Sequence, residues 1–251
     1  SEWADTAVIT LSRFSAEGVD RRPQGGDYYL SDIEKDLISS AGKLFKKVII
    51  VINSGATIDC EYFAENSKIG AVLMSWQGGM EGGNALADVL TGAVNPSGRL
   101  ADTWAVHYED YPSANTFGHR NGDLHNEDYA EGIYVGYRWF EKHDIAPRFP
   151  FGHGLSYTSF ETEAITVSDR AAVMKVTNTG KTAGRETVML FVQKPDGAFD
   201  HEKRSLVGFC KTHLLAPGES ETGTISFDLW EVASFEEAAN AFALEAGTYT
   251  L

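Results

Sequence analysis

The sequence has few of the features that define several large classes of protein. Only two cysteines, Cys60 and Cys210, occur in 251 residues, and they stand far apart, so no disulfide framework is expected. No apolar run approaches the roughly 18 residues of a membrane span, and the first residues lack the basic segment of a signal peptide. The seven histidines lack metal-binding spacing. We therefore expect a soluble protein without a metal or other cofactor. The sequence does not determine the compartment, although the cytoplasm is slightly favoured.

Basic residues are also scarce relative to acidic ones. The chain has 21 Lys and Arg against 36 Asp and Glu, which gives a formal net charge of −15. A surface with this charge repels nucleic acid and anionic lipid, so neither is expected as a partner. A neutral ligand such as a sugar is compatible with it. Apolar residues make up 43% of the sequence, which argues against disorder and for folded cores.

The first part of the chain contains continuous apolar runs. Runs without alternation of apolar and polar residues are typical of strands that are buried on both faces of a parallel sheet. The sequence therefore predicts an α/β domain over residues 1–107, with a partial parallel sheet. Its predicted strands are residues 7–11, 48–52 and 71–76.

Helical patterns alternate with these runs. Ser31 and Glu34 form a capping-box pattern, and apolar residues then recur at helical spacing as far as Phe45. Asp32 falls in the first turn of this predicted helix, where a carboxylate complements the helix dipole. Two further helices are predicted at residues 57–65 and 84–90.

The second part of the chain has a different pattern. Residues 108–160 are rich in aromatic residues, and we predict an ordered connector because disordered segments contain few of them. Residues 161–251 contain short apolar segments separated by turn sequences such as Asn178-Thr179-Gly180. This spacing predicts a β-sandwich of about seven strands. The predicted strands include residues 165–167, 173–176, 188–192 and 225–227.

Several motifs resemble those of β-glucosidases of glycoside hydrolase family 3. They are EGVDR at 17–21, a stretch at 76–100 that begins WQGGMEGG and ends NPSGRL, GIYVGYRWF at 132–140, and FPFGHGLSYT at 149–158. The last ninety residues look like the fibronectin-III-like domain of that family. The resemblance covers nearly the whole chain. It implies the later part of an α/β sandwich followed by a truncated, Ig-like fibronectin-III-like sandwich.

The resemblance implies a retaining hydrolase that acts on terminal, non-reducing β-D-glucosyl residues. Such enzymes use two carboxyl groups about 5–5.5 Å apart, one as nucleophile and one as acid/base. In the family the nucleophile is an Asp on a (β/α)8 barrel, and the acid/base Glu comes from the α/β sandwich. The match places the acid/base at Glu17. Asp20 and Arg21 are expected either to bind substrate or to support the loop through an ion pair.

The same resemblance implies that part of the protein is missing. No eight-fold barrel is expected in these 251 residues, so the chain is interpreted as a piece of a longer parent. The expected partners are a β-glucoside or oligosaccharide substrate and the barrel domain of the same parent. The chain alone is expected to be inactive.

Other interpretations stay open. Glu17 could be a solvated loop carboxylate in a carbohydrate-binding or structural module without catalysis. A nucleotide-binding α/β protein is a second alternative, but the glycines at 78, 79, 82 and 83 lack phosphate-loop spacing. We interpret them as sites of tight packing between a strand and a helix. Trp76 could stack on a sugar, although a core position is preferred, and Glu81 is expected at a helix N-terminus.

Overall fold

The computed structural model describes residues 2–14, 20–127 and 129–251, which belong to two compact units. The first unit comprises Ser1–Ala87, Trp104–Ala130 and Ala146–Phe149. The second comprises Asp88–Thr103, Glu131–Ile145 and Pro150–Leu251. Both units draw on segments that are distant in the sequence. The domain boundaries that the sequence suggests, at residues 107 and 160, stay a prediction.

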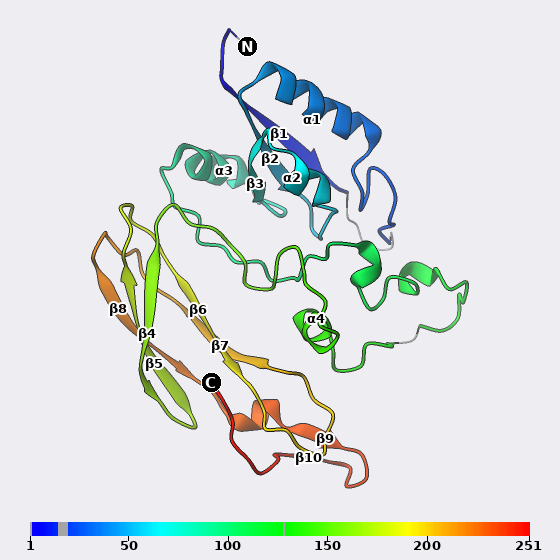
Figure 1. The fold of residues 1–251 in the computed structure, drawn as a ribbon, viewed down its shortest axis with the longest axis vertical. Coiled ribbons are helices and arrows are strands. Elements are labelled where there is room, and N and C mark those ends of the chain that lie inside the picture. The colour runs from blue at the N-terminus through cyan, green and yellow to red at the C-terminus, as the bar shows by residue number, and fades with distance from the viewer. Residues whose placement is uncertain (1, 15–19, 128) are drawn as a thin grey trace. The chain divides into compact units, whose positions relative to one another are not determined.

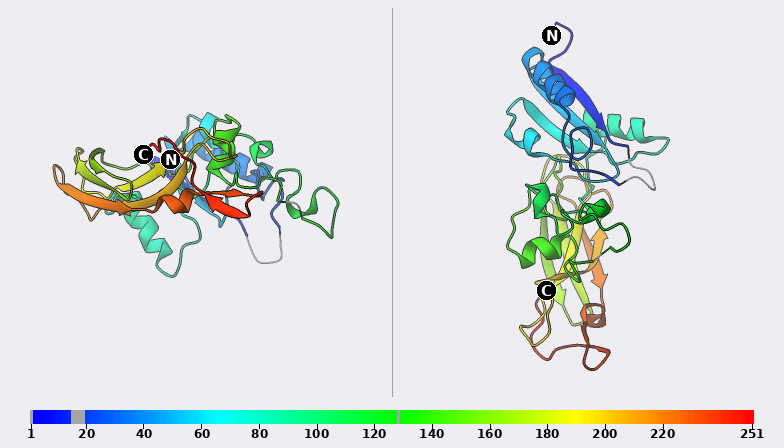
Figure 2. Two further views of the ribbon diagram at one scale, coloured as in Figure 1. Left: turned by 90° about the horizontal axis from the view of Figure 1, so that it is seen from below. Right: turned by 90° about the vertical axis from the view of Figure 1, so that its right-hand side faces the viewer.

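The first unit contains a parallel sheet, as the sequence predicts. Its strands are β1 (Thr6–Ser12), β2 (Lys47–Asn53) and β3 (Ile69–Met74), in the order β1-β2-β3. Helix α1 (Asp32–Leu44) connects the first two strands and lies along the sheet (Figures 1 and 2). Parallel strands end at the same edge of a sheet, so the loops that follow β1 and β2 are neighbours there.

The expectation that all three strands are buried on both faces is wrong for the outer two. The central strand β2 has four buried residues, whereas β1 alternates between exposed and buried positions and β3 has no buried residue. Val8 of β1 is 51% exposed and Val72 of β3 is 41% exposed. An outer strand has only one neighbouring strand, and the described residues leave much of its surface uncovered.

The capping box predicted for α1 is confirmed. Ser31 Oγ accepts a hydrogen bond from the Glu34 backbone N–H, and Glu34 Oε2 accepts one from the Ser31 backbone N–H at 2.8 Å. Asp32 is the first helical residue, which confirms its place in the first turn. Because the cap satisfies N–H groups that have no partner within the helix, it fixes where α1 begins.

The other two helices of the α/β region agree with the sequence to different degrees. Helix α3 (Gly82–Thr91) matches its prediction and ends before Gly92, whose φ of 78° suits glycine. Helix α2 (Glu61–Glu65) is shorter than the predicted 57–65. The Asp59 N–H donates to the Tyr28 carbonyl at 2.8 Å, so the chain just before α2 is held outside the helix.

The aromatic segment predicted as a connector contributes to both units. Its described elements are two 3₁₀ turns, η1 (Tyr108–Asp110) and η2 (Phe117–His119), and helix α4 (Tyr137–Lys142). In the second unit the Tyr137 ring stacks on Phe151, with the ring centres 5.1 Å apart, and its hydroxyl accepts the Leu206 N–H at 2.9 Å. These aromatic residues therefore pack on the β-structure instead of forming a free linker.

The second unit contains the predicted antiparallel sandwich (Figure 1). Strands β4 (Phe160–Val167), β5 (Ala171–Asn178) and β8 (Ser220–Ser226) form one sheet, and β6 (Thr187–Val192) pairs with β7 (Ser205–Lys211). A 3₁₀ turn, η3 (Leu229–Val232), follows β8. A short hairpin, β9 (Ser234–Glu236) and β10 (Ala241–Ala243), completes the described strands. The buried core of the second unit includes residues of β5, β6, β7 and β8 and of the segment after β8. These are Ala172, Met174, Leu190, Val192, Val207, Ile225, Phe227 and Val232.

The structure also describes the state of the two cysteines and the apolar character of the helices. Both cysteines are free, Cys60 in the first unit and Cys210 in the second. Within the described part of the chain, no helix combines the length and the apolar character needed to cross a bilayer.

Asn178, at the end of β5, is a hub of the second unit, and its loss is expected to destabilise that unit. The side chain is fully buried; its Nδ2 donates to the carbonyls of Thr182 and Leu215, each at 2.9 Å. Its Oδ1 accepts from Thr158 Oγ1 and the Gly180 N–H. Asn178→Ala leaves these groups without their partner, so we expect it to lower the free energy of unfolding by about 3–5 kcal/mol.

Urea unfolding followed by circular dichroism measures this loss. Thr177→Ala is the matched control, because Thr177 precedes Asn178 in the same strand and its hydroxyl only meets Ser220 Oγ at the surface. The control is expected to stay within about 1 kcal/mol of the original chain. A cost for Asn178→Ala as small as that of the control would contradict the hub role.

Candidate functional site

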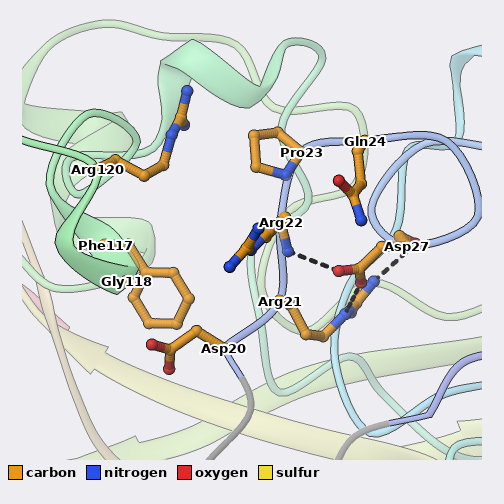
Figure 3. A pocket seen from close by; sticks show the side chains of 9 residues that line it. All are labelled: Asp20, Arg21, Arg22, Pro23, Gln24, Asp27, Phe117, Gly118 and Arg120. Atoms are coloured by element: carbon orange, nitrogen blue, oxygen red, sulfur yellow. Dashed lines mark hydrogen bonds and ion pairs between the residues drawn. The ribbon is translucent and has the colours of Figure 1, made fainter.

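A pocket of about 650 Å³ lies in the first unit, in the segment that follows β1 (Figure 3). Residues 20–24 and Asp27 line it from this segment, and Phe117, Gly118 and Arg120 line it from η2 and its vicinity. In parallel α/β sheets, ligands bind beyond the carboxyl ends of the strands. Glu17, the predicted acid/base, lies outside the described residues, three positions before Asp20 in the sequence.

Three side chains give the pocket its chemical character. Figure 3 shows the side chain of Arg22 extending toward the Phe117 ring, with Asp20 near the same ring. A carboxylate accepts hydrogen bonds from hydroxyl groups, a guanidinium donates them, and an aromatic ring offers an apolar face. This combination suits a neutral ligand that carries both hydroxyl groups and C–H faces.

Gly118 permits two lining segments of this pocket to approach each other closely. A Cβ atom at this position would stand 3.2 Å from Asp20 Cβ, and the backbone φ is 64°. Both the space and the left-handed conformation favour glycine. Beyond Gly118, the Arg120 guanidinium lies 5.4 Å from the centre of the Tyr108 ring and donates to the Ala114 carbonyl.

Arg21 also lines the pocket, and all three of its side-chain nitrogens donate hydrogen bonds. Its Nε donates to Asp27 Oδ1 at 2.7 Å, and its Nη2 donates to the Asp27 carbonyl at 2.9 Å. Its Nη1 donates to the Thr57 carbonyl at 2.8 Å, in the loop after β2. Arg21 thus pairs with Asp27 and not with its neighbour Asp20. Whether Asp20 and Arg21 bind substrate or support the loop stays a prediction.

Arg13, one residue after β1, forms a second fixed ion pair. Its side chain is 3% exposed, and its Nη1 and Nη2 donate to the two carboxylate oxygens of Glu34 at 2.6 and 3.0 Å. Burial raises the pKa of Glu34, but hydrogen bonds from Arg13 and Ser31 outweigh this effect and hold that pKa below its usual value. The end of β1 is therefore joined to the cap of α1 through a bidentate charged contact.

The other motif residues occupy different surroundings. Trp76, just after β3, is half-buried, so the expectation of a core position is wrong; stacking on a sugar stays a prediction. Its φ of 52° is unusual for a bulky residue. The expectation of tight glycine packing is also wrong for three glycines, since a Cβ at 79, 82 or 83 would meet none of the described atoms within 4 Å. Glu81 lies directly before α3, as expected.

The sequence did not identify several residues that form this site. Arg13, Arg22, Asp27, Phe117 and Arg120 were missed, because their importance depends on contacts between distant segments. The charged run DRRPQGGD at 20–27 was a possible signal. Among the described residues, no group of three or more His, Cys, Asp or Glu could hold a metal ion.

Comparisons with known proteins find two matching family models and many similar sequences. The model of the glycosyl hydrolase family 3 C-terminal domain matches residues 1–157, and that of a fibronectin type III-like domain matches residues 186–251. Among curated relatives, the chain is 39% identical to beta-glucosidase A of Butyrivibrio fibrisolvens and 40% identical to a beta-glucosidase of Ruminococcus albus. These alignments cover 98% and 100% of the chain but only 35% and 27% of the relatives.

Solved structures agree with this similarity. The structure of beta-glucosidase 3B from Thermotoga neapolitana in complex with glucose has a TM-score of 0.91 and 38% identity, and covers 99% of this chain. A beta-glucosidase from Paenibacillus barengoltzii has a TM-score of 0.92 and 36% identity, again over 99% of the chain. The chain corresponds to 35% and 28% of these two proteins, so it spans about a third of their length.

Proposed function

The chain belongs to glycoside hydrolase family 3, and from this membership we propose that it is part of a retaining β-glucosidase to which it supplies the acid/base carboxyl group of Glu17. The observation that supports the proposal most is the pocket that begins three residues after Glu17. Its carboxylate, guanidinium and aromatic ring suit a sugar hydroxyl and C–H surface. The second carboxyl group would come from the barrel domain of the longer parent.

The reaction divides between these two carboxyl groups. In the first step the nucleophile of the barrel domain attacks the anomeric carbon, while Glu17 donates its proton to the departing glycosidic oxygen. In the second step the ionised Glu17 takes a proton from water, and the resulting hydroxide displaces the nucleophile from the same carbon. Two inversions retain the β configuration, and Glu17 ends protonated as it began.

The described residues have separate roles in this proposal. Arg21 supports the loop, because its three nitrogens already donate to Asp27 and Thr57. Asp20 and Arg22 line the pocket with Phe117, so they contact the leaving group of the substrate. The substrate class is a β-glucoside or a short β-linked oligosaccharide, which is neutral and so compatible with the net charge of −15.

The stereochemistry of hydrolysis tests the proposal. The full-length parent is expected to release β-glucose first from an aryl β-glucoside, as seen by proton NMR of the anomeric signal before mutarotation. Glucose added to buffer at the same pH gives the rate of mutarotation as the control. First release of the α-anomer, or no turnover of any β-glucoside, would contradict the proposed function.

A further inference from the structure

The segment that carries Glu17 has both of its ends tied to a single residue. Arg13 stands before this segment and Arg21 after it, eight positions apart. The Arg13 Nε donates to the Asp27 carbonyl at 2.5 Å, and the Arg21 Nη2 donates to the same carbonyl at 2.9 Å. The guanidinium groups of Arg13 and Arg21, which flank residues 14–20 on either side, therefore both bind the Asp27 carbonyl.

The Asp27 side chain adds two further contacts at the second end. Its Oδ1 accepts from Arg21 Nε at 2.7 Å, and its Oδ2 accepts from the Arg22 backbone N–H at 2.6 Å. Figure 3 shows both contacts as dashed lines. The Asp27 side chain is 22% exposed and that of Arg21 is 16% exposed, so these charge-assisted bonds are only partly hydrated. The carboxylate thus holds two successive residues at the exit of the segment.

Asp27 is itself fixed to the body of the first unit. The next residue, Tyr28, is 6% exposed, and its ring meets the Tyr108 ring edge-on, with centres 4.9 Å apart. The Tyr28 carbonyl accepts the Asp59 N–H at 2.8 Å. A turn over residues 22–29, closed by the Tyr28 N–H to the Arg22 carbonyl, holds Asp27 in place. Through these contacts, Asp27 can keep the residues that flank the Glu17 segment at a fixed position relative to the rest of the first unit.

We propose that Asp27 is a positioning residue for the acid/base, because it joins both ends of the segment that carries Glu17 to the fixed part of the first unit. The inference rests on the proposed function, since it acts through Glu17. Asp27 does not touch the reacting atoms. Its carboxylate sets where the exit of the segment stands, and its carbonyl joins that exit to Arg13.

Removal of the Asp27 carboxylate should therefore have the same effect on the rate as a displacement of the proton donor Glu17. A catalytic group that is misplaced by about 1 Å can cost roughly 10²-fold in rate. Asp27→Ala in the full-length parent is expected to lower kcat/KM by about 10–10²-fold on phenyl β-glucoside, whose leaving group needs protonation. On 2,4-dinitrophenyl β-glucoside, which leaves without much help, the loss is expected to be a few-fold or less. Asp27→Asn keeps an acceptor for Arg21 and should recover much of the phenyl glucoside activity.

The matched control is Glu61→Ala, which removes another ion pair of the first unit. Glu61 pairs with Arg148 through both carboxylate oxygens, and its side chain is 24% exposed, close to the 22% of Asp27. It has no hydrogen bond to Arg13, Arg21 or Asp27 among the described residues. Its loss is expected to change kcat/KM by the same small factor on both substrates, even if it lowers the melting temperature.

Glu17→Gln is measured beside these variants to separate two kinds of failure. If Glu17→Gln discriminates between the two substrates and neither Asp27 variant does, the positioning role is overturned and the proposed function stands. If Glu17→Gln does not discriminate, the proposed function fails. Equal losses for Asp27→Ala on both substrates, without recovery in Asp27→Asn, mean that Asp27 has only a structural role. Should Asp27→Ala not fold, Arg21→Lys takes its place, because lysine cannot reproduce the paired contacts of Arg21 with Asp27. An unchanged substrate ratio in Arg21→Lys then overturns the inference.

Discussion

Replacement of Glu17 by Gln in the full-length parent is expected to slow hydrolysis of cellobiose by about 10²–10⁴-fold, the range typical of general acid catalysis. Glutamine has nearly the same shape as glutamic acid, but it cannot donate a proton to the departing oxygen. An alkoxide leaving group depends on that proton. The comparison of kcat/KM between original and variant enzymes on cellobiose measures the effect.

The same variant should respond differently to an activated substrate. Dinitrophenolate leaves with little protonation, so the first step should lose little on dinitrophenyl β-glucoside. The second step then limits turnover, because the amide that replaces the carboxylate cannot activate water. Azide needs no deprotonation, so it should restore turnover and give a β-glucosyl azide, since two inversions retain the configuration.

Glu65→Gln supplies the control, because Glu65 is an exposed carboxylate at the end of α2. It should change neither rate nor product. An equal loss for Glu17→Gln on all substrates, with no azide rescue, would identify Glu17 as a binding or structural residue. The acid/base would then have to be sought elsewhere in the parent.

Local sequence signals predict elements of the fold where the neighbouring residues decide the structure. The β-branched run of β2 and the Ser31–Glu34 capping box of α1 are both local signals, and both are confirmed. Strand β7 was missed because Gly208 interrupts its apolar pattern, and it exists through its pairing with β6. The burial of β1 and β3 was wrong because it depends on what covers an outer strand, which no local pattern reports.

The candidate site depends even more on contacts between distant segments, which local sequence patterns do not predict. Asp20 and Arg21 were identified through the motif at 17–21, but adjacency in the sequence suggested that they pair with each other. The structure pairs Arg21 with Asp27 because a turn brings residue 27 back against residue 21. The contribution of Phe117 and Arg120 requires a segment nearly one hundred residues away to return to the same pocket. Contacts of this range are set by tertiary packing and have no signature in composition or spacing.

The purified 251-residue chain alone is expected to show no hydrolysis of aryl β-glucosides above the uncatalysed rate. A retaining mechanism needs a nucleophile about 5–5.5 Å from the acid/base, and we assign that group to the part of the parent outside this chain. An acid without a nucleophile cannot form the glycosyl-enzyme. The assay is release of nitrophenolate at high enzyme concentration, with circular dichroism to verify that the chain is folded.

The Glu17→Gln form of the same chain separates a true signal from contamination. A contaminating glycosidase gives equal release in both preparations, because it does not depend on Glu17. Release that is present in the original chain and lost in Glu17→Gln would contradict the divided site, and would place both carboxyl groups within these 251 residues. The full-length parent, assayed at the same concentration, must be active for the absence of turnover in the chain to count. If this chain and the barrel domain each supply one of the two carboxyl groups, the parent is active and the 251-residue chain alone is inactive.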